Sequence, residues 1–161
     1  MGTIRIVWGT ATGPTAMASY DAALAAANVH NYNLVSVSSV IPAGASVEVV
    51  GEASTLGPAG ERLTVVEGRS TVSPGASDPA AACLGWTREP DGPGIFYEAS
   101  GTDSEDVRRR VEDGLAAGRA LRESAWDFGD EHYRLAVADA DSDRYATAVV
   151  LAVYGESEPI V

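Results

Sequence analysis

The chain has 161 residues, of which 45% are hydrophobic and 21% are charged, a balance typical of one globular domain with a sizeable core. Its 23 acidic residues outnumber its 11 basic residues, all of them arginine, which gives a formal net charge of −12. Such a charge repels nucleic acid and anionic membrane surfaces, so neither is expected as a partner.

Two explanations fit this acidic, lysine-free composition. A negative field attracts a cationic substrate. The composition also resembles that of proteins from salt-loving archaea, in which concentrated salt screens the repulsion between surface carboxylates. We favour the second explanation, because the same salt would screen the steering of a substrate.

The start of the chain and its cysteine content indicate the cytoplasm. Residues 1–8 enter a strand-like segment without the basic start and the cleavage site of a signal peptide. No apolar run has the length of a membrane-spanning helix. The single cysteine, Cys83, has no disulfide partner and is expected to be a buried, inert thiol.

The apolar patterns predict eight strands and two helices. A strand at residues 3–8 precedes a helix that follows Pro14, which is tolerated in a first turn, and runs to about residue 27. A second helix opens with a capping box at residues 102–105 and continues to Leu121. The other strands are expected at residues 33–41, 46–50, 63–67, 80–86, 94–99, 133–138 and 145–154. This order argues against a repeated βαβ unit and favours one α+β domain spanning residues 1–161.

The most informative motif is the pair Ser38 and Ser39, which lies near the end of a predicted strand and shortly before Pro42. In some proenzymes a serine hydroxyl in such a place attacks the preceding carbonyl carbon and forms an ester. Elimination and hydrolysis then leave a pyruvoyl group, an electrophilic ketone that the chain makes from itself. The pair taken alone also fits two ordinary serines in a strand.

Two carboxylates are further candidates. Met17, Asp21 and Leu24 fall on one face of the first predicted helix, and a carboxylate in an apolar stripe is costly unless a cation meets it. Glu98 ends the strand that contains Tyr97, where burial would raise its pKa and suit it to be a general acid. The alternatives are a solvent-facing aspartate and an ordinary glutamate at a strand end.

No metal site is expected, because His30 and His132 lie far apart in the sequence and neither belongs to a cluster with the spacing of metal ligands.

Three segments resemble the pyruvoyl-dependent arginine decarboxylases. They are GPTAMASYDAAL at residues 13–24, NLVSVSSVIP at 33–42 and GIFYE at 94–98. The resemblance implies a four-layer αββα sandwich of mainly antiparallel sheets with flanking helices, assembled as a trimer with active sites between subunits. It also implies self-cleavage between Ser38 and Ser39 into chains 1–38 and 39–161, with the pyruvoyl group taking the place of pyridoxal phosphate.

The same resemblance implies roles for individual residues. Asp21 would bind the substrate's guanidinium, with Met17 and Leu24 beside its methylene groups. Glu98 would return a proton to the α-carbon after decarboxylation. Asn33 would stabilise the oxyanion formed during self-cleavage, although Asn31 competes for that assignment.

The function expected is therefore conversion of L-arginine to agmatine and carbon dioxide by a self-processing enzyme of salt-loving type, a step that serves polyamine synthesis. One alternative is the same cofactor acting on another amino acid. The other is a trimeric binding or scaffold protein that keeps the fold without cleavage.

Overall fold

The computed structural model describes residues 2–161, which form nine strands and two helices. In chain order these are β1 (Thr3–Gly13), α1 (Ala16–Ala26), β2 (Asn33–Ser36), β3 (Val40–Ile41), β4 (Ser46–Gly51), β5 (Arg62–Val72), β6 (Ala80–Arg88), β7 (Gly94–Gly101), α2 (Ser104–Ala120), β8 (Glu131–Ala138) and β9 (Tyr145–Tyr154).

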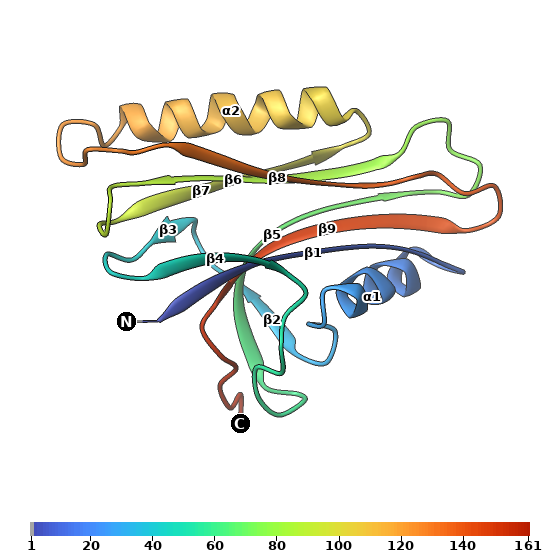
Figure 1. The fold of residues 1–161 in the computed structure, drawn as a ribbon. Helices are drawn as coiled ribbons and strands as arrows, with labels where there is room; N and C mark the ends of the chain where they lie inside the picture. Colours follow the sequence, from blue (N-terminus) through green and yellow to red (C-terminus); the bar gives the residue numbers. More distant parts are fainter. Residues whose placement is uncertain (1) are drawn as a thin grey trace.

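The strands form two sheets that pack face to face, with one helix on each outer face (Figure 1). The five-stranded sheet has the order β2-β5-β9-β1-β4, and the four-stranded sheet has the order β3-β7-β6-β8. Pairing is antiparallel except between β1 and β4 and between β2 and β5. The four-layer α+β sandwich expected from the resemblance is confirmed.

Three apolar clusters account for the layers. One fills the space between the sheets, one lies between α1 and the five-stranded sheet, and one lies between α2 and the four-stranded sheet. Strands β6 and β9 are buried on both faces, which explains why their sequences are nearly continuous apolar runs. Cys83 on β6 is buried, as predicted.

Helix α1 packs unusually close to β1. Gly9 and Gly13 face the helix, and a Cβ atom at Gly9 would overlap the carbonyl oxygen of Ala23. The buried Ser19 hydroxyl lies 2.6 Å from the hydroxyl of Thr147 on β9. Close backbone approach and a buried hydroxyl pair therefore fix the helix on the sheet.

Helix α2 begins one residue later than the predicted capping box. Its N-cap is Asp103, whose carboxylate accepts hydrogen bonds from the backbone N–H groups of Glu105 and Asp106. The expected Thr102 cap is wrong, because the aspartate next to it is a better N-cap acceptor and its negative charge complements the helix dipole.

The predicted strand 33–41 is wrong in one important respect. It is two strands, β2 and β3, which belong to different sheets. The Val37 N–H group still bonds to the Val65 carbonyl on β5, at 3.1 Å, whereas the Ser39 carbonyl accepts from Phe96 on β7, at 2.8 Å. The chain crosses from one sheet to the other between these bonds, and an apolar pattern carries no information about which neighbour a strand pairs with.

Several other strands are longer than predicted, most of all β1, which runs to Gly13, and β5, which runs to Val72. Within residues 2–161, no helix combines the length and the apolar character needed to cross a membrane.

Candidate active site

The serine pair lies at the crossing between the two sheets. The Val40 N–H group bonds back to the Ser38 carbonyl oxygen at 2.9 Å, which closes a tight turn centred on Ser39. Ser38 is exposed and Ser39 is partly buried. The peptide bond between the two serines is therefore held in a defined geometry at the rim of the sandwich.

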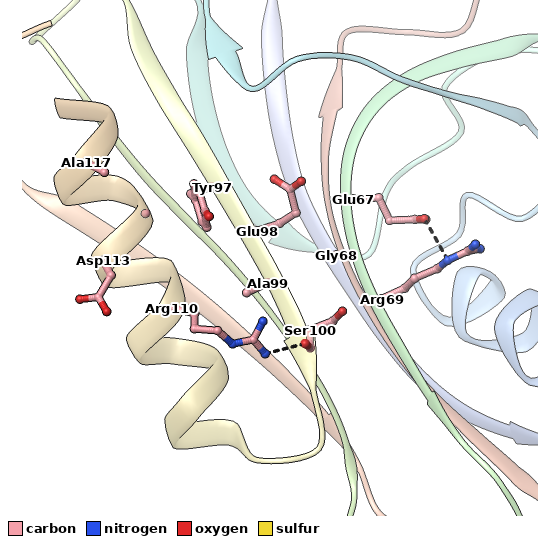
Figure 2. Close-up of a pocket in the computed structure, with 11 residues that line it drawn as sticks. Glu67, Gly68, Arg69, Tyr97, Glu98, Ala99, Ser100, Arg110, Asp113 and Ala117 are labelled. Carbon is pink, nitrogen blue, oxygen red and sulfur yellow. Dashed lines mark hydrogen bonds and ion pairs between the residues drawn. The ribbon is translucent and has the colours of Figure 1, made fainter. Parts of the chain in front are cut away.

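Glu98 faces this turn from β7. Its Oε2 atom lies 3.5 Å from the Ser39 Oγ atom, at the long end of hydrogen-bonding range. Figure 2 shows its side chain on the side of β7 that is turned toward β5, where Gly68 lies opposite it. Burial raises the pKa of the Glu98 carboxyl above its ordinary value, and hydrogen bonding to its own backbone and to Ser39 offsets only part of that rise. A carboxyl group whose pKa is raised by burial therefore lies beside Ser39.

Two adjoining cavities open on this region. One of about 360 Å³ is lined by Ser38 and Ser39 together with residues of β7 and α2. The other, of about 700 Å³, contains Glu98 (Figure 2). Tyr97 and Gly114 line both cavities, and the tyrosine ring occupies the space that a Cβ atom at Gly114 would need.

A third cavity, of about 610 Å³, lies beside α1 and contains Met17, Asp21, Leu24 and Asn33 among its lining residues. The face predicted for the first helix is thus real. Asp21 is exposed and Met17 is 72% exposed, whereas Leu24 is buried. Within one chain, the predicted recognition residues are together, and they line a different cavity from Ser39 and Glu98.

Asn33 lines the same cavity as Asp21. It begins β2, and its side-chain Nδ2 donates to the Gly60 carbonyl at 2.7 Å. The donor that contacts the Ser38 carbonyl is the backbone N–H of Val40. In a single chain, the Asn33 side chain thus bonds to Gly60 and not to the Ser38 carbonyl.

Comparison with known proteins decides the family. The sequence profile of the pyruvoyl-dependent arginine decarboxylases matches residues 3–159. The chain belongs to this family.

Three relatives named pyruvoyl-dependent arginine decarboxylase illustrate the similarity. The protein of Halobacterium salinarum is 51% identical over 99% of this chain and 98% of its own length. That of Thermococcus kodakarensis is 32% identical over 89% and 88%, and that of Methanopyrus kandleri is 30% identical over 92% and 93%. The resemblance drawn from three short segments therefore extends over nearly the whole chain.

The residues around position 39 fit the pyruvoyl group for which the family is named. Ser39 lines a cavity, its carbonyl oxygen accepts the Phe96 N–H, and the Glu98 carboxyl lies 3.5 Å from its Oγ. Phe96 and Glu98 would be the residues beside a ketone formed at position 39. Within residues 2–161, no group of three or more His, Cys, Asp or Glu side chains is arranged to hold a metal ion.

Sequence reasoning missed one polar cluster between the two regions. The Tyr20 hydroxyl on α1 donates to the Glu67 carboxylate on β5, at 2.8 Å and 3.1 Å to its two oxygens. The Arg69 guanidinium lies over the Tyr20 ring, 4.4 Å from its centre, and its Nε atom is 4.0 Å from Glu67. Burial raises the pKa of Glu67, and it raises that of Tyr20 to about 12. The three residues belong to α1 and β5, which are far apart in the sequence, so no local pattern pointed to this cluster.

Proposed function

We propose that this chain is a carboxy-lyase that converts L-arginine to agmatine and carbon dioxide, with a pyruvoyl group made from its own Ser39. The observation that carries the proposal is the contact between Ser39 and the Glu98 carboxyl, at a turn where the backbone crosses between two sheets. The family membership and the arginine named for its relatives supply the reaction and the substrate.

The first step is cleavage of the chain by its own serine. The Ser39 Oγ attacks the Ser38 carbonyl carbon, and its proton passes to the amide nitrogen as the C–N bond breaks, which leaves an ester. Loss of the Ser39 Cα proton and of the ester oxygen releases the Ser38 carboxylate and leaves a dehydroalanine. One water then replaces the nitrogen, so that ammonia departs and the pyruvoyl group begins chain 39–161.

In turnover, the pyruvoyl group supplies an electron-withdrawing carbonyl for the carbon that loses carbon dioxide. The chain's own residues bind the substrate and deliver the proton. Glu98, whose carboxyl has a pKa raised by burial and lies beside residue 39, is the proposed donor of the proton to the α-carbon. Asp21 offers two carboxylate oxygens to a guanidinium, and Met17 and Leu24 contact the methylene groups.

Assembly is part of the proposal, because each chain holds the two halves of the site in different cavities. Apolar side chains around the serine pair are exposed, including Val37 at 40%, Val40 at 43% and Leu121 at 81%. Exposed apolar residues of this kind favour burial against another subunit. We expect a homo-oligomer, a trimer by resemblance, in which α1 of one protomer completes the Ser39 site of its neighbour.

The acidic, lysine-free composition and the Halobacterium relative support a cytoplasmic protein adapted to high salt. Neither decarboxylation of another amino acid nor an uncleaved scaffold has an observation in its favour.

The test is an intact-mass measurement on protein expressed and kept in high salt, followed by an agmatine assay. We expect chains 1–38 and 39–161, the larger one lighter by one ammonia than a plain serine N-terminus, and agmatine formed from arginine. Ser39→Ala should give one uncut chain and no measurable turnover. An uncut wild-type chain that makes no agmatine would contradict the proposal, and a cut chain active only on another amino acid would contradict the substrate.

A further inference from the structure

The turn around Ser39 has a specific form. The hydrogen bond from the Val40 N–H to the Ser38 carbonyl spans three residues and defines a γ-turn. Among residues 2–161, the non-glycine residues with positive φ are Asn28 and Asp91. Ser39 therefore has negative φ, and the turn is the inverse γ form, which is found at strand ends.

This turn directs a donor at the oxygen that must become negative during cleavage. When the Ser39 Oγ attacks, the Ser38 carbonyl carbon becomes tetrahedral and negative charge develops on its oxygen. A fixed N–H group aimed at that oxygen stabilises the charge without rearrangement. We propose that the Val40 N–H is the oxyanion donor of self-cleavage, so that the scissile bond carries its own catalytic group two residues downstream. This inference rests on the self-cleavage proposed above.

The turn is anchored on both sides. The Ser39 carbonyl accepts from the Phe96 N–H at 2.8 Å, and the Val40 carbonyl accepts from the Tyr154 hydroxyl at 2.8 Å. Tyr154 ends β9 in the other sheet, and its ring meets the edge of the Phe96 ring at a centroid distance of 6.1 Å. Burial raises the pKa of the Tyr154 hydroxyl to about 12, so it is a donor at every working pH. Tyr154 is thus a positioning residue. It holds the Val40 carbonyl and thereby the orientation of the Val40 N–H group.

The chain offers a matched test of the backbone donor. Cell-free translation with a suppressor tRNA that carries α-hydroxyisovalerate replaces one valine by its ester analogue, which keeps the side chain and removes the N–H group. At position 40 the exchange removes the donor to Ser38. At position 37 the same exchange removes the bond to the Val65 carbonyl on the other side of the serine pair. Cleavage is then followed by intact mass at neutral pH in high salt, which also separates a break at residues 38–39 from hydrolysis of the new ester.

We expect the position 40 ester to slow cleavage at least 10-fold, and up to the 100-fold or more typical of a lost oxyanion donor. The position 37 ester should cleave within about threefold of the wild type. Equal rates for the two esters would overturn the inference while leaving self-cleavage intact. Failure of the wild-type chain to cleave would contradict the proposed function instead.

Tyr154→Phe tests the anchor with the ring kept in place. The variant should cleave several-fold more slowly while giving the same two products, and its circular dichroism should match the wild type. Tyr133→Phe is the control, because it removes a hydroxyl that donates to Glu131, away from the turn. The position 40 ester combined with Tyr154→Phe should cleave no more slowly than the ester alone. Additive effects in the pair would show that Tyr154 acts through the general fold and not through Val40.

Discussion

The Ser39 region and the α1 region are built in opposite ways. Around Ser39, bonds from three distant strands hold the backbone, and the Glu98 carboxyl is partly buried with a raised pKa. On α1, Asp21 is exposed on one helix face. The groups proposed to react are thus held within one chain by several elements, whereas the groups proposed to recognise the substrate lie on an exposed helix face. Substitutions near Ser39 should therefore change turnover or cleavage, whereas substitutions on α1 should change the KM for arginine.

The largest effect is expected from Glu98→Gln. The amide keeps the shape and an acceptor for Ser39 but cannot donate a carboxylic proton, so turnover should fall about 10²- to 10⁴-fold while the chain still cleaves. Steady-state kinetics on cleaved protein, with cleavage checked by mass, measures this. Turnover within a few-fold of the wild type would remove Glu98 from the role of general acid.

Asp21→Asn should weaken binding of arginine and leave the chemical steps at residue 39 intact. Loss of a charge-assisted hydrogen bond to the guanidinium should raise the KM for arginine about 10- to 100-fold, with cleavage unchanged. Asp78→Asn makes the same change of charge on an exposed loop and should leave KM unchanged. If both variants alter KM equally, the effect belongs to net charge and not to recognition.

Gly9→Ala tests whether the seating of α1 matters for recognition. The added methyl would overlap the Ala23 carbonyl and push the helix outward, at a cost of about 1–3 kcal/mol in unfolding free energy. We expect a lower melting temperature and a several-fold higher KM, with the cleavage rate near that of the wild type. Slower cleavage with an unchanged KM would show that the two regions are coupled through the sheet.

The smallest effect should come from Glu67→Gln, through the pH dependence of stability. Because burial raises the pKa of Glu67 in the folded state, the folded protein binds more protons than the unfolded chain between its unfolded and folded pKa values. This carboxyl therefore lowers stability as pH rises from about 4 through its folded pKa. In a Ser39→Ala background, urea midpoints between pH 4 and 7 should fall less steeply for Glu67→Gln. Parallel slopes would mean that Glu67 titrates normally.

Features that depend on local sequence patterns could be predicted from the sequence. Features that depend on contacts between residues distant in the sequence could not. The helix face of Met17, Asp21 and Leu24 was predictable, because helical spacing is a local property. The break between β2 and β3 was not, since it depends on which strand each half pairs with. Tyr154 lies 114 residues from Val40, a contact that no local pattern encodes.

The self-cleavage proposal, together with the place of β1 in the sheet, has a consequence for how the mature protein unfolds. Strand β1 lies between β9 and β4 and pairs with β9 from Ile4 to Gly13. The 1–38 fragment would therefore remain embedded in the fold after the cut, and unfolding would release two chains instead of one. A reversible one-chain equilibrium would become a two-chain association, so the melting temperature of the cut protein should rise with its concentration, while that of uncut Ser39→Ala should rise less.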